Sequence, residues 1–115
     1  FSTNPPMRDL PRNYFVEAFA TSVFLTAILC IAQNYEPWLP VGVGLLVWAV
    51  GMGFGGTTGF AMNQARDLGP RLAYQVLPIR NKADNDWQYG LLVPGTAPFV
   101  GAVVAALFCR FFLGM

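Results

Sequence analysis

The chain has 115 residues, of which 55% are hydrophobic and 11% are charged. Soluble domains carry about 25% charged residues, so this composition favours a membrane protein. The net charge of +1 excludes the strongly basic surface of a nucleic-acid-binding protein. The absence of histidine excludes imidazole catalysis and imidazole metal ligands. We expect no metal and no cofactor.

Charged residues are missing from three long ranges of the chain: 18–35, 37–65 and 87–109. A helix rises 1.5 Å per residue, so about 20 apolar residues cross the hydrocarbon core of a bilayer. The expected fold class is therefore an all-α membrane protein. The three expected membrane spans are residues 14–34, 41–58 and 88–113.

The first span follows a polar, proline-rich segment in which Pro11 suits a loop just before a helix. Glu17 is the only charged residue of this span, and Arg110 lies near the end of the last span. Both positions favour side chains that reach the membrane interface. Cys30 and Cys109 lie in apolar runs without metal-binding spacing, which predicts buried free thiols.

The connection to the second span contains Pro37 and Pro40, which prevent the first helix from continuing. Trp38 and Trp48 are large amphipathic side chains that can anchor a helix in a bilayer. Of the two, Trp38 is the one that we expect at the membrane interface, because it lies in the connection.

Small residues recur in the second and third spans. Gly51, Gly55 and Gly59 follow one another at a four-residue spacing, which permits close helix packing in lipid. The glycine stripe is either a contact face between helices or a set of residues that widen a pore, and the sequence leaves both readings open. In the last span, Pro94 and Pro98 predict a kink, and small residues again follow at helical spacing: Gly101, Ala102, Ala105 and Ala106.

Residues 59–77 contain a helix-compatible run, 65–76, whose twelve residues are too few to span a bilayer. Asn63 is a favoured N-cap, and Asp67 would lie in the first turn of a short helix, where the helix dipole favours an anion. A short helix with an apolar approach predicts a re-entrant segment, because non-helical backbone at membrane depth needs protein or a wet cavity around it. Pro78 ends this helix, and residues 79–86 form a solvated loop.

Arg66 is the first cation of this segment. It either reaches the interface or a neighbouring helix end, or it faces a permeation pathway, since charges at membrane depth are unfavourable elsewhere. Arg66 and Asp67 are adjacent, so on a helix they point in different directions and do not form an obvious pair.

Residues 59–71, GFAMNQARDLGPR, resemble the second signature loop of the aquaporin/glycerol-facilitator family. They are most similar to the aquaglyceroporin branch, in which Asp follows the Arg of the loop. The flanking sequences FVEAFATSVFLTAIL, VGVGLLVWAVGMGFGG and DNDW to VGAVVAAL resemble the fourth, fifth and sixth spans of that family. The resemblance covers nearly the whole chain. It implies the C-terminal half of an inverted-repeat bundle, so we expect the N-terminal half to be absent from this sequence.

The resemblance implies a selectivity filter formed by Arg66, Phe60 and Gly51, with a fourth residue from the missing half. Arg66 offers a rigid fork of donors to hydroxyl groups. Phe60 offers a flat apolar face to a carbon skeleton. Gly51 stands where water-selective members have His, which leaves room for glycerol.

The resemblance also assigns roles to the signature triplet Asn63-Gln64-Ala65 and its neighbours. Asn63 would donate its side-chain amide to the permeating molecule. Along one wall of the pore, hydrogen bonds from the solute would be accepted by the backbone carbonyls of Gly59, Phe60 and Ala61. Asp67, the mark of the branch, supports the motif.

Two positions depart from the family pattern. Gln64 stands where the family has Pro, which restores an N–H group at the first helical position and adds an amide. In some members a buried Glu of the fourth span supports the signature loop. The aligned residue here is Ser22, and Glu17, five residues earlier, is not an obvious replacement.

Together these features predict passive passage of glycerol and similar small uncharged solutes, with water. Enzyme motifs are missing, so the chain is not expected to be an enzyme. Two alternatives remain: a water, hydrogen peroxide or lactic-acid-type channel, and a non-conducting packing or interaction subunit. The resemblance implies a homotetramer in the lipid bilayer of the cell membrane, completed by the missing half of the same fold.

Overall fold

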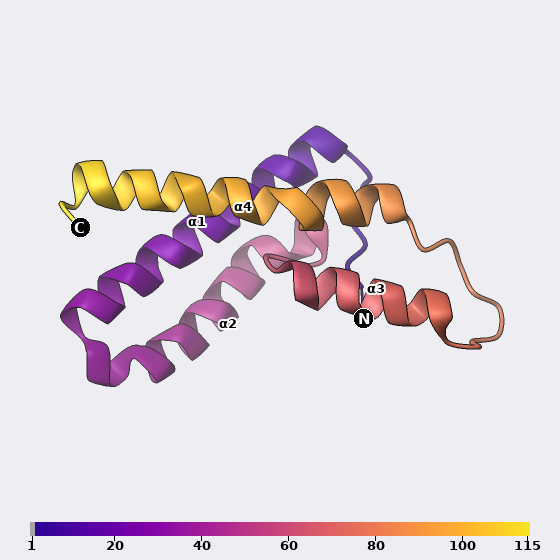
Figure 1. Ribbon diagram of the computed structural model, residues 1–115, viewed down its shortest axis with the longest axis horizontal. Helices are drawn as coiled ribbons and strands as arrows, with labels where there is room; N and C mark the ends of the chain where they lie inside the picture. Colours follow the sequence, from indigo (N-terminus) through magenta and orange to yellow (C-terminus); the bar gives the residue numbers. More distant parts are fainter. Residues whose placement is uncertain (1) are drawn as a thin grey trace.

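The computed structural model describes residues 2–115, which contain four α-helices, one short 3₁₀ helix and no strand (Figure 1). Three stretches are long and apolar enough to cross a membrane: Leu10–Asn34, Glu36–Thr58 and Trp87–Phe112. The expected all-helical membrane fold with one additional short helix is therefore confirmed. The elements are α1 (Leu10–Asn34), η1 (Glu36–Trp38), α2 (Leu39–Thr58), α3 (Gln64–Val76) and α4 (Trp87–Phe112).

Prolines begin helices here. The side chain of Asp9 caps α1 by accepting a hydrogen bond from the backbone N–H of Arg12 at 3.2 Å, and Pro11 lies in the first turn. The helix therefore begins at Leu10, earlier than the expected Tyr14. Pro37 and Pro40 likewise occupy the first turns of η1 and α2. Proline is favoured there because its fixed φ suits a helix and its missing N–H is not needed.

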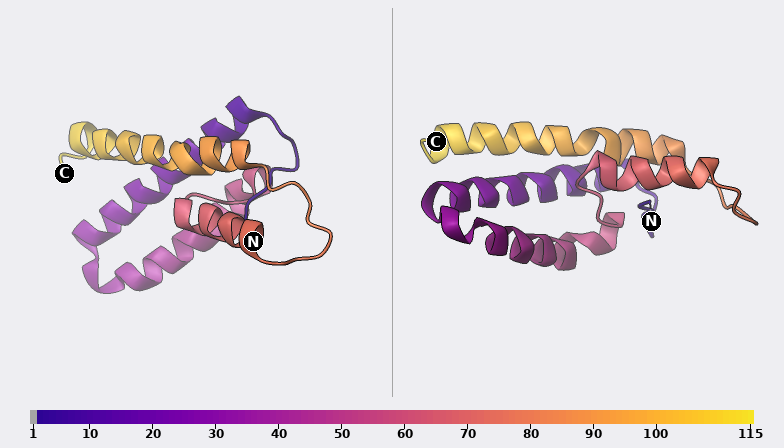
Figure 2. Two further views of the ribbon diagram at one scale, coloured as in Figure 1. Left: turned by 45° about the vertical axis from the view of Figure 1, so that its right-hand side comes forward. Right: turned by 60° about the horizontal axis from the view of Figure 1, so that its bottom comes forward.

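The helices α1 and α2 form an antiparallel pair, and α4 packs across α1 (Figures 1 and 2). The helices α1 and α4 pack tightly at Gly101, where an added Cβ would collide with the carbonyl oxygen of Ala18 and the side chain of Thr21. The face of α4 that is buried at this crossing consists of small residues: Ala97, Gly101, Ala105 and Cys109. Of the small residues expected to form a pattern in the last span, Gly101 and Ala105 are thus buried, whereas Ala102 is half-buried and Ala106 is exposed.

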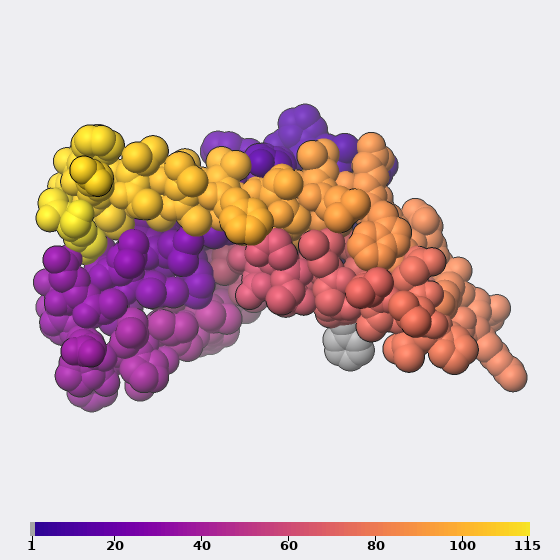
Figure 3. Space-filling model, viewed as in Figure 1, coloured from indigo at the N-terminus to yellow at the C-terminus, as the bar shows by residue number. Residues whose placement is uncertain are grey.

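The short helix α3 packs against the first half of α4, and the molecule is elongated, with extents of 51 × 29 × 21 Å (Figures 1 and 3). The helix α4 continues through Pro94 and Pro98 without interruption. Cys109 is buried and Cys30 is half-buried, and both are free thiols. Many large apolar side chains on the outer faces of α1, α2 and α4 are exposed, as lipid-facing side chains are.

Candidate functional site

The segment between α2 and α3, residues 59–63, has an irregular backbone. Gly59 ends α2 with φ +86°, and Phe60 and Met62 also adopt left-handed conformations, with φ of +62° and +50°. Such conformations are unfavourable for residues with a Cβ and persist only where the surroundings hold them. These five residues are the irregular first part of the motif at residues 59–71. From here on, the name signature loop refers to residues 59–63 alone.

Glu17 of α1 holds the signature loop. Its carboxylate accepts hydrogen bonds from the backbone N–H groups of Ala61 at 3.1 Å and Met62 at 2.7 Å, and from the hydroxyl of Thr58 at 2.5 Å. The residue is only 1% exposed. The expectation that Glu17 reaches the membrane interface, and is no replacement for the family's supporting Glu, is therefore wrong.

Helix geometry explains why Ser22 does not contact the loop. Five residues along an α-helix correspond to a rotation of about 140°, so Ser22 and Glu17 face different directions. The hydroxyl of Ser22 donates a hydrogen bond to the carbonyl oxygen of Phe19 within its own helix, at 2.8 Å. The expected position of the residue that supports the loop, Ser22, is therefore wrong, and the supporting residue is Glu17.

Two further residues that the sequence analysis missed fix the end of α2. Thr58 is buried, and its carbonyl oxygen accepts a hydrogen bond from the hydroxyl of Tyr89 of α4 at 3.1 Å. The hydroxyl of Thr58 also accepts a bond from the N–H of Phe60 at 3.4 Å. The loop is thus tied to α1 through Glu17, and the end of α2 just before it is tied to α4 through Tyr89. The sequence contained a signal for these contacts. An irregular apolar loop needs acceptors for its N–H groups, and Glu17 and Thr58 are polar residues within apolar spans.

The N–H groups of residues 59–62 are bonded within the protein, but three carbonyl oxygens of the loop are not. Among residues 2–115, no hydrogen bond ends on the carbonyl oxygens of Gly59, Phe60 or Ala61. Asn63 caps α3 as expected: its Oδ1 accepts bonds from the N–H groups of Ala65 at 2.8 Å and Arg66 at 3.4 Å. The Oδ1 is used for the cap, so the Nδ2 group can serve as a donor.

Phe60 packs on the glycine stripe of α2. A Cβ added at Gly51 would lie 3.3 Å from Cζ of Phe60, and one added at Gly55 would lie 3.2 Å from its Cβ. Gly59 instead provides the left-handed turn beside Asn4. Within residues 2–115, Gly51 and Gly55 therefore lie against Phe60, and whether the stripe also packs on another helix or widens a pore stays a prediction.

The remaining sequence candidates lie at the start of α3, in the loop and on α2. Asn63, Ala65 and Arg66 are exposed there, while Gln64 is half-buried as the first residue of the helix. Phe60 and Gly51 lie against each other across the loop. The six positions thus lie in three consecutive parts of the chain: α2, the irregular backbone and the start of α3.

Asp67 points away from this turn and pairs with Arg71, one turn along α3. The carboxylate of Asp67 accepts two bonds from the guanidinium of Arg71, from Nε and from one terminal nitrogen, each at 2.9 Å. It also accepts the N–H and the hydroxyl of Thr3, at 2.6 and 2.5 Å. Asp67 is 0% exposed. The (i, i+4) spacing of Asp67 and Arg71 could have indicated this pair.

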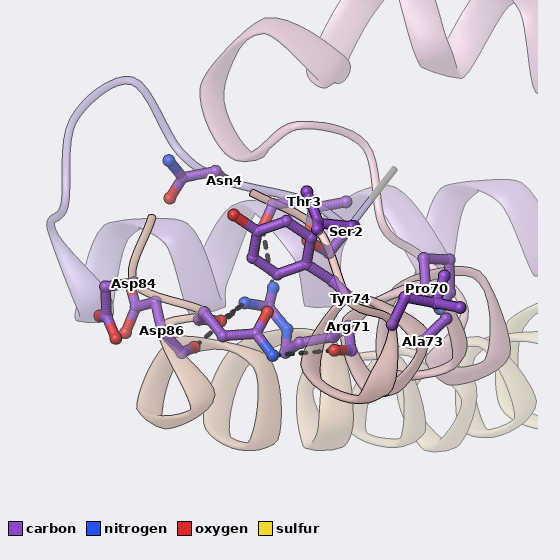
Figure 4. Close-up of a pocket in the computed structure, with 12 residues that line it drawn as sticks. Ser2, Thr3, Asn4, Pro70, Arg71, Ala73, Tyr74, Asp84 and Asp86 are labelled. Atoms are coloured by element: carbon purple, nitrogen blue, oxygen red, sulfur yellow. Dashed lines mark hydrogen bonds between the residues drawn. The ribbon is translucent and has the colours of Figure 1, made fainter. Parts of the chain in front are cut away.

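The guanidinium of Arg71 joins three segments (Figure 4). Besides Asp67, it donates to the carbonyl oxygens of Thr3 at 2.8 Å, Asp86 at 3.1 Å and Asn85. It lies on Gly90, where any side chain would collide with it. Arg71 therefore fastens α3 to the N-terminal segment and to the start of α4. Beside this cluster lies a cavity of about 580 Å³, lined by α3, residues 2–4 and the loop before α4.

The sequence matches a known family. A sequence model described as the major intrinsic protein family matches residues 4–109. Glycerol uptake facilitator protein 4 of Lactiplantibacillus plantarum is 63% identical over 116 residues, which cover 100% of this chain and 49% of that protein. The D/L-lactic acid transporter of the same organism is 61% identical, with the same coverage.

A solved structure agrees with these matches. The aquaglyceroporin from Plasmodium falciparum superimposes with a TM-score of 0.84 at 32% sequence identity, covering 97% of this chain and 49% of that one. The chain thus spans about half the length of the relatives that it matches. These comparisons confirm the resemblance that residues 59–71 indicated.

Proposed function

Because the chain belongs to the major intrinsic protein family, we propose that it forms the C-terminal half of a channel for glycerol and other small uncharged solutes, with water. One observation carries the proposal. The N–H groups of residues 59–62 are bonded within the protein, while the carbonyl oxygens of Gly59, Phe60 and Ala61 accept no bond from residues 2–115. Such open acceptors at membrane depth suit a wet pathway.

The chemistry of glycerol suits this arrangement. A dehydrated polyol needs hydrogen-bonding groups on one wall of a pore and an apolar surface on the other. The loop carbonyls and the Nδ2 group of Asn63 supply acceptors and a donor. The ring of Phe60 supplies an apolar face. No bond is made or broken, so the proposed activity is passive passage rather than catalysis.

The proposed filter consists of Arg66, Phe60 and Gly51, with a further residue from the other half of the channel. Arg66 holds a fixed positive charge in the first turn of α3, at the end of the helix where the dipole is also positive. Both would repel cations and protons while offering donors to hydroxyl groups. Gly51 keeps the space beside Phe60 free of a side chain.

Undissociated lactic acid is a second candidate solute. The observation that favours it is the 61% identity to a relative named as a D/L-lactic acid transporter, close to the 63% identity to the glycerol facilitator. A protonated hydroxy acid has polar groups and an apolar methyl group, as the pore walls require. Lactate entry into vesicles that rises with the undissociated fraction, as the external pH falls, would support this solute.

The channel requires partners beyond this chain. The family resemblance supports a second half of the same fold, a homotetramer and the lipid bilayer of the cell membrane as surroundings. The exposed apolar faces of α1, α2 and α4 provide surface for all three contacts. Two alternatives to the glycerol channel remain: a channel for water or hydrogen peroxide, and a non-conducting packing subunit. Flux measurements distinguish both of them from a glycerol channel.

The test uses the full-length channel in lipid vesicles, with stopped-flow light scattering for glycerol and water. We expect Gly51→His to reduce glycerol passage more than water passage, because the new side chain must displace Phe60. The matched control is Gly53→His: Gly53 has no atom within 4 Å of an added Cβ. No glycerol passage in the unaltered protein would overturn the function, and equal loss of both fluxes in Gly51→His would overturn the filter.

A further inference from the structure

Trp48 lies at the midpoint of α2, roughly 14 Å from either end of the helix at 1.5 Å per residue. Its side chain is 69% exposed, and its indole N–H donates no hydrogen bond to any residue between 2 and 115. Trp38, by contrast, lies at the end of the span with a similar exposure of 67%. Of these two tryptophans, Trp38 lies at the depth where tryptophan anchors a helix.

The middle of a membrane helix is an unfavourable place for an unpaired indole. Tryptophan is enriched at the two bilayer interfaces, where its ring is apolar and its N–H reaches water. A buried Trp N–H usually has a hydrogen-bond partner, and lipid chains provide none. The position of Trp48 therefore favours a surface that meets polar molecules over one that meets lipid.

A groove of about 410 Å³ on the structure connects Trp48 to the proposed filter. Its lining consists of one face of α2 together with the ring of Phe60: Gly44, Val47, Trp48, Gly51, Met52 and Phe60. Two aromatic side chains, Trp48 and Phe60, and two glycines thus line the same groove. An added Cβ at Gly44 would meet no atom within 4 Å. Trp48 lies one helical turn from Gly51, at the next level of the same groove.

We propose that Trp48 is a further specificity-determining residue of the pore, one turn from the filter, where its indole N–H donates to an oxygen of the permeating solute. This inference rests on the proposed channel function. The ring bounds the width of the pathway, and the N–H replaces one hydrogen bond that the solute loses with its hydration shell. Glycerol depends on this donor more than water does, because water in a file keeps hydrogen bonds to its neighbours.

The first test is Trp48→Phe in the full-length channel, since this change keeps an aromatic ring and removes the donor. We expect the glycerol-to-water permeability ratio to fall about three- to tenfold, as the loss of one hydrogen bond predicts. The matched control, Trp38→Phe, should leave the ratio unchanged. We expect Trp48→Ala to widen the groove and to raise the passage of a five-carbon polyol relative to glycerol.

The second test does not depend on flux. Lipids brominated deep in their acyl chains quench a tryptophan that touches them, so they report whether Trp48 faces lipid. We expect these lipids to quench the unaltered channel no more than the Trp48→Phe variant. Stronger quenching of the unaltered channel would overturn the proposal.

The flux outcomes separate this proposal from the channel function. An unaltered protein that passes no glycerol would overturn both. A protein that passes glycerol, with the same glycerol-to-water ratio in Trp48→Phe and Trp38→Phe, would overturn the role of Trp48 alone. A changed oligomeric state of Trp48→Phe with an unchanged ratio would also overturn it, by assigning Trp48 to a contact between subunits.

Discussion

Two buried carboxylates hold the two sides of the candidate site in different ways. Glu17 bonds neutral donors: two backbone N–H groups of the signature loop and the hydroxyl of Thr58. Asp67 bonds a cation, Arg71, through two parallel hydrogen bonds, and also accepts the N–H and hydroxyl of Thr3. Both side chains are almost completely inaccessible to solvent.

The difference between them follows from what each carboxylate holds. A loop in left-handed conformations exposes N–H groups that cannot pair with one another, so an anion between them satisfies several at once. The Asp67 cluster instead joins three segments that are far apart in sequence, and a guanidinium with five donors can reach all of them. The first cluster shapes the irregular backbone, and the second anchors the helix that follows it.

The largest effect is expected from Arg71→Met, which leaves the charge of Asp67 buried without its cation. Breaking a buried ion pair on one side destabilises a protein by about 3–5 kcal/mol. Thermal unfolding in detergent would measure it. The control is Arg8→Met, because Arg8 pairs with Asp86 at 2.8 Å in an exposed position, where such pairs contribute about 0–1 kcal/mol. Similar melting temperatures for the two variants would contradict the assigned role of Arg71.

A smaller but still large effect is expected from Glu17→Ala. The change removes the acceptor of two buried donors and one part-buried donor. A buried donor left unsatisfied costs about 1–3 kcal/mol, and water can reach the part-buried one, so we expect a total loss of about 2–4 kcal/mol. Glu17→Gln keeps one acceptor oxygen, so its melting temperature should lie between those of the unaltered protein and of Glu17→Ala. Glycerol flux should fall together with stability, because the loop carbonyls lose their fixed positions. The control is Glu36→Ala, at the exposed start of η1. Unchanged melting and flux in Glu17→Ala would show that the loop is held by other contacts.

The smallest effect is expected from Gln64→Pro, which touches neither carboxylate. Asn63 caps the N–H groups of Ala65 and Arg66 and not that of Gln64, so proline at this first helical position removes no bond of the cap. A compatible proline stabilises by about 0.4–1 kcal/mol through the unfolded state. Gln64→Ala controls for loss of the amide. A lower melting temperature, or a changed glycerol-to-water ratio, would show that Gln64 contributes to the pore.

Local patterns predicted much of this protein, because they depend on neighbours in sequence. Apolar length predicted three membrane helices, and Asn63 with Asp67 in the first turn predicted the start of α3, since a cap acts within one turn. The motif of residues 59–71 predicted the family. The filter roles of Arg66, Phe60 and Gly51 stay predictions.

Contacts between distant segments could only be settled by the tertiary structure. Glu17 and Met62 are 45 positions apart, and Thr3 and Asp67 are 64 apart. Whether Glu17 or Ser22 faces the loop depends on the rotation of α1 as it packs on α4, and a shift of a few residues reverses the answer. The sequence also leaves open what packs on the glycine stripe, because small residues leave space for either another helix or an aromatic ring. In the structure, the side chain of Phe60 packs on Gly51 and Gly55.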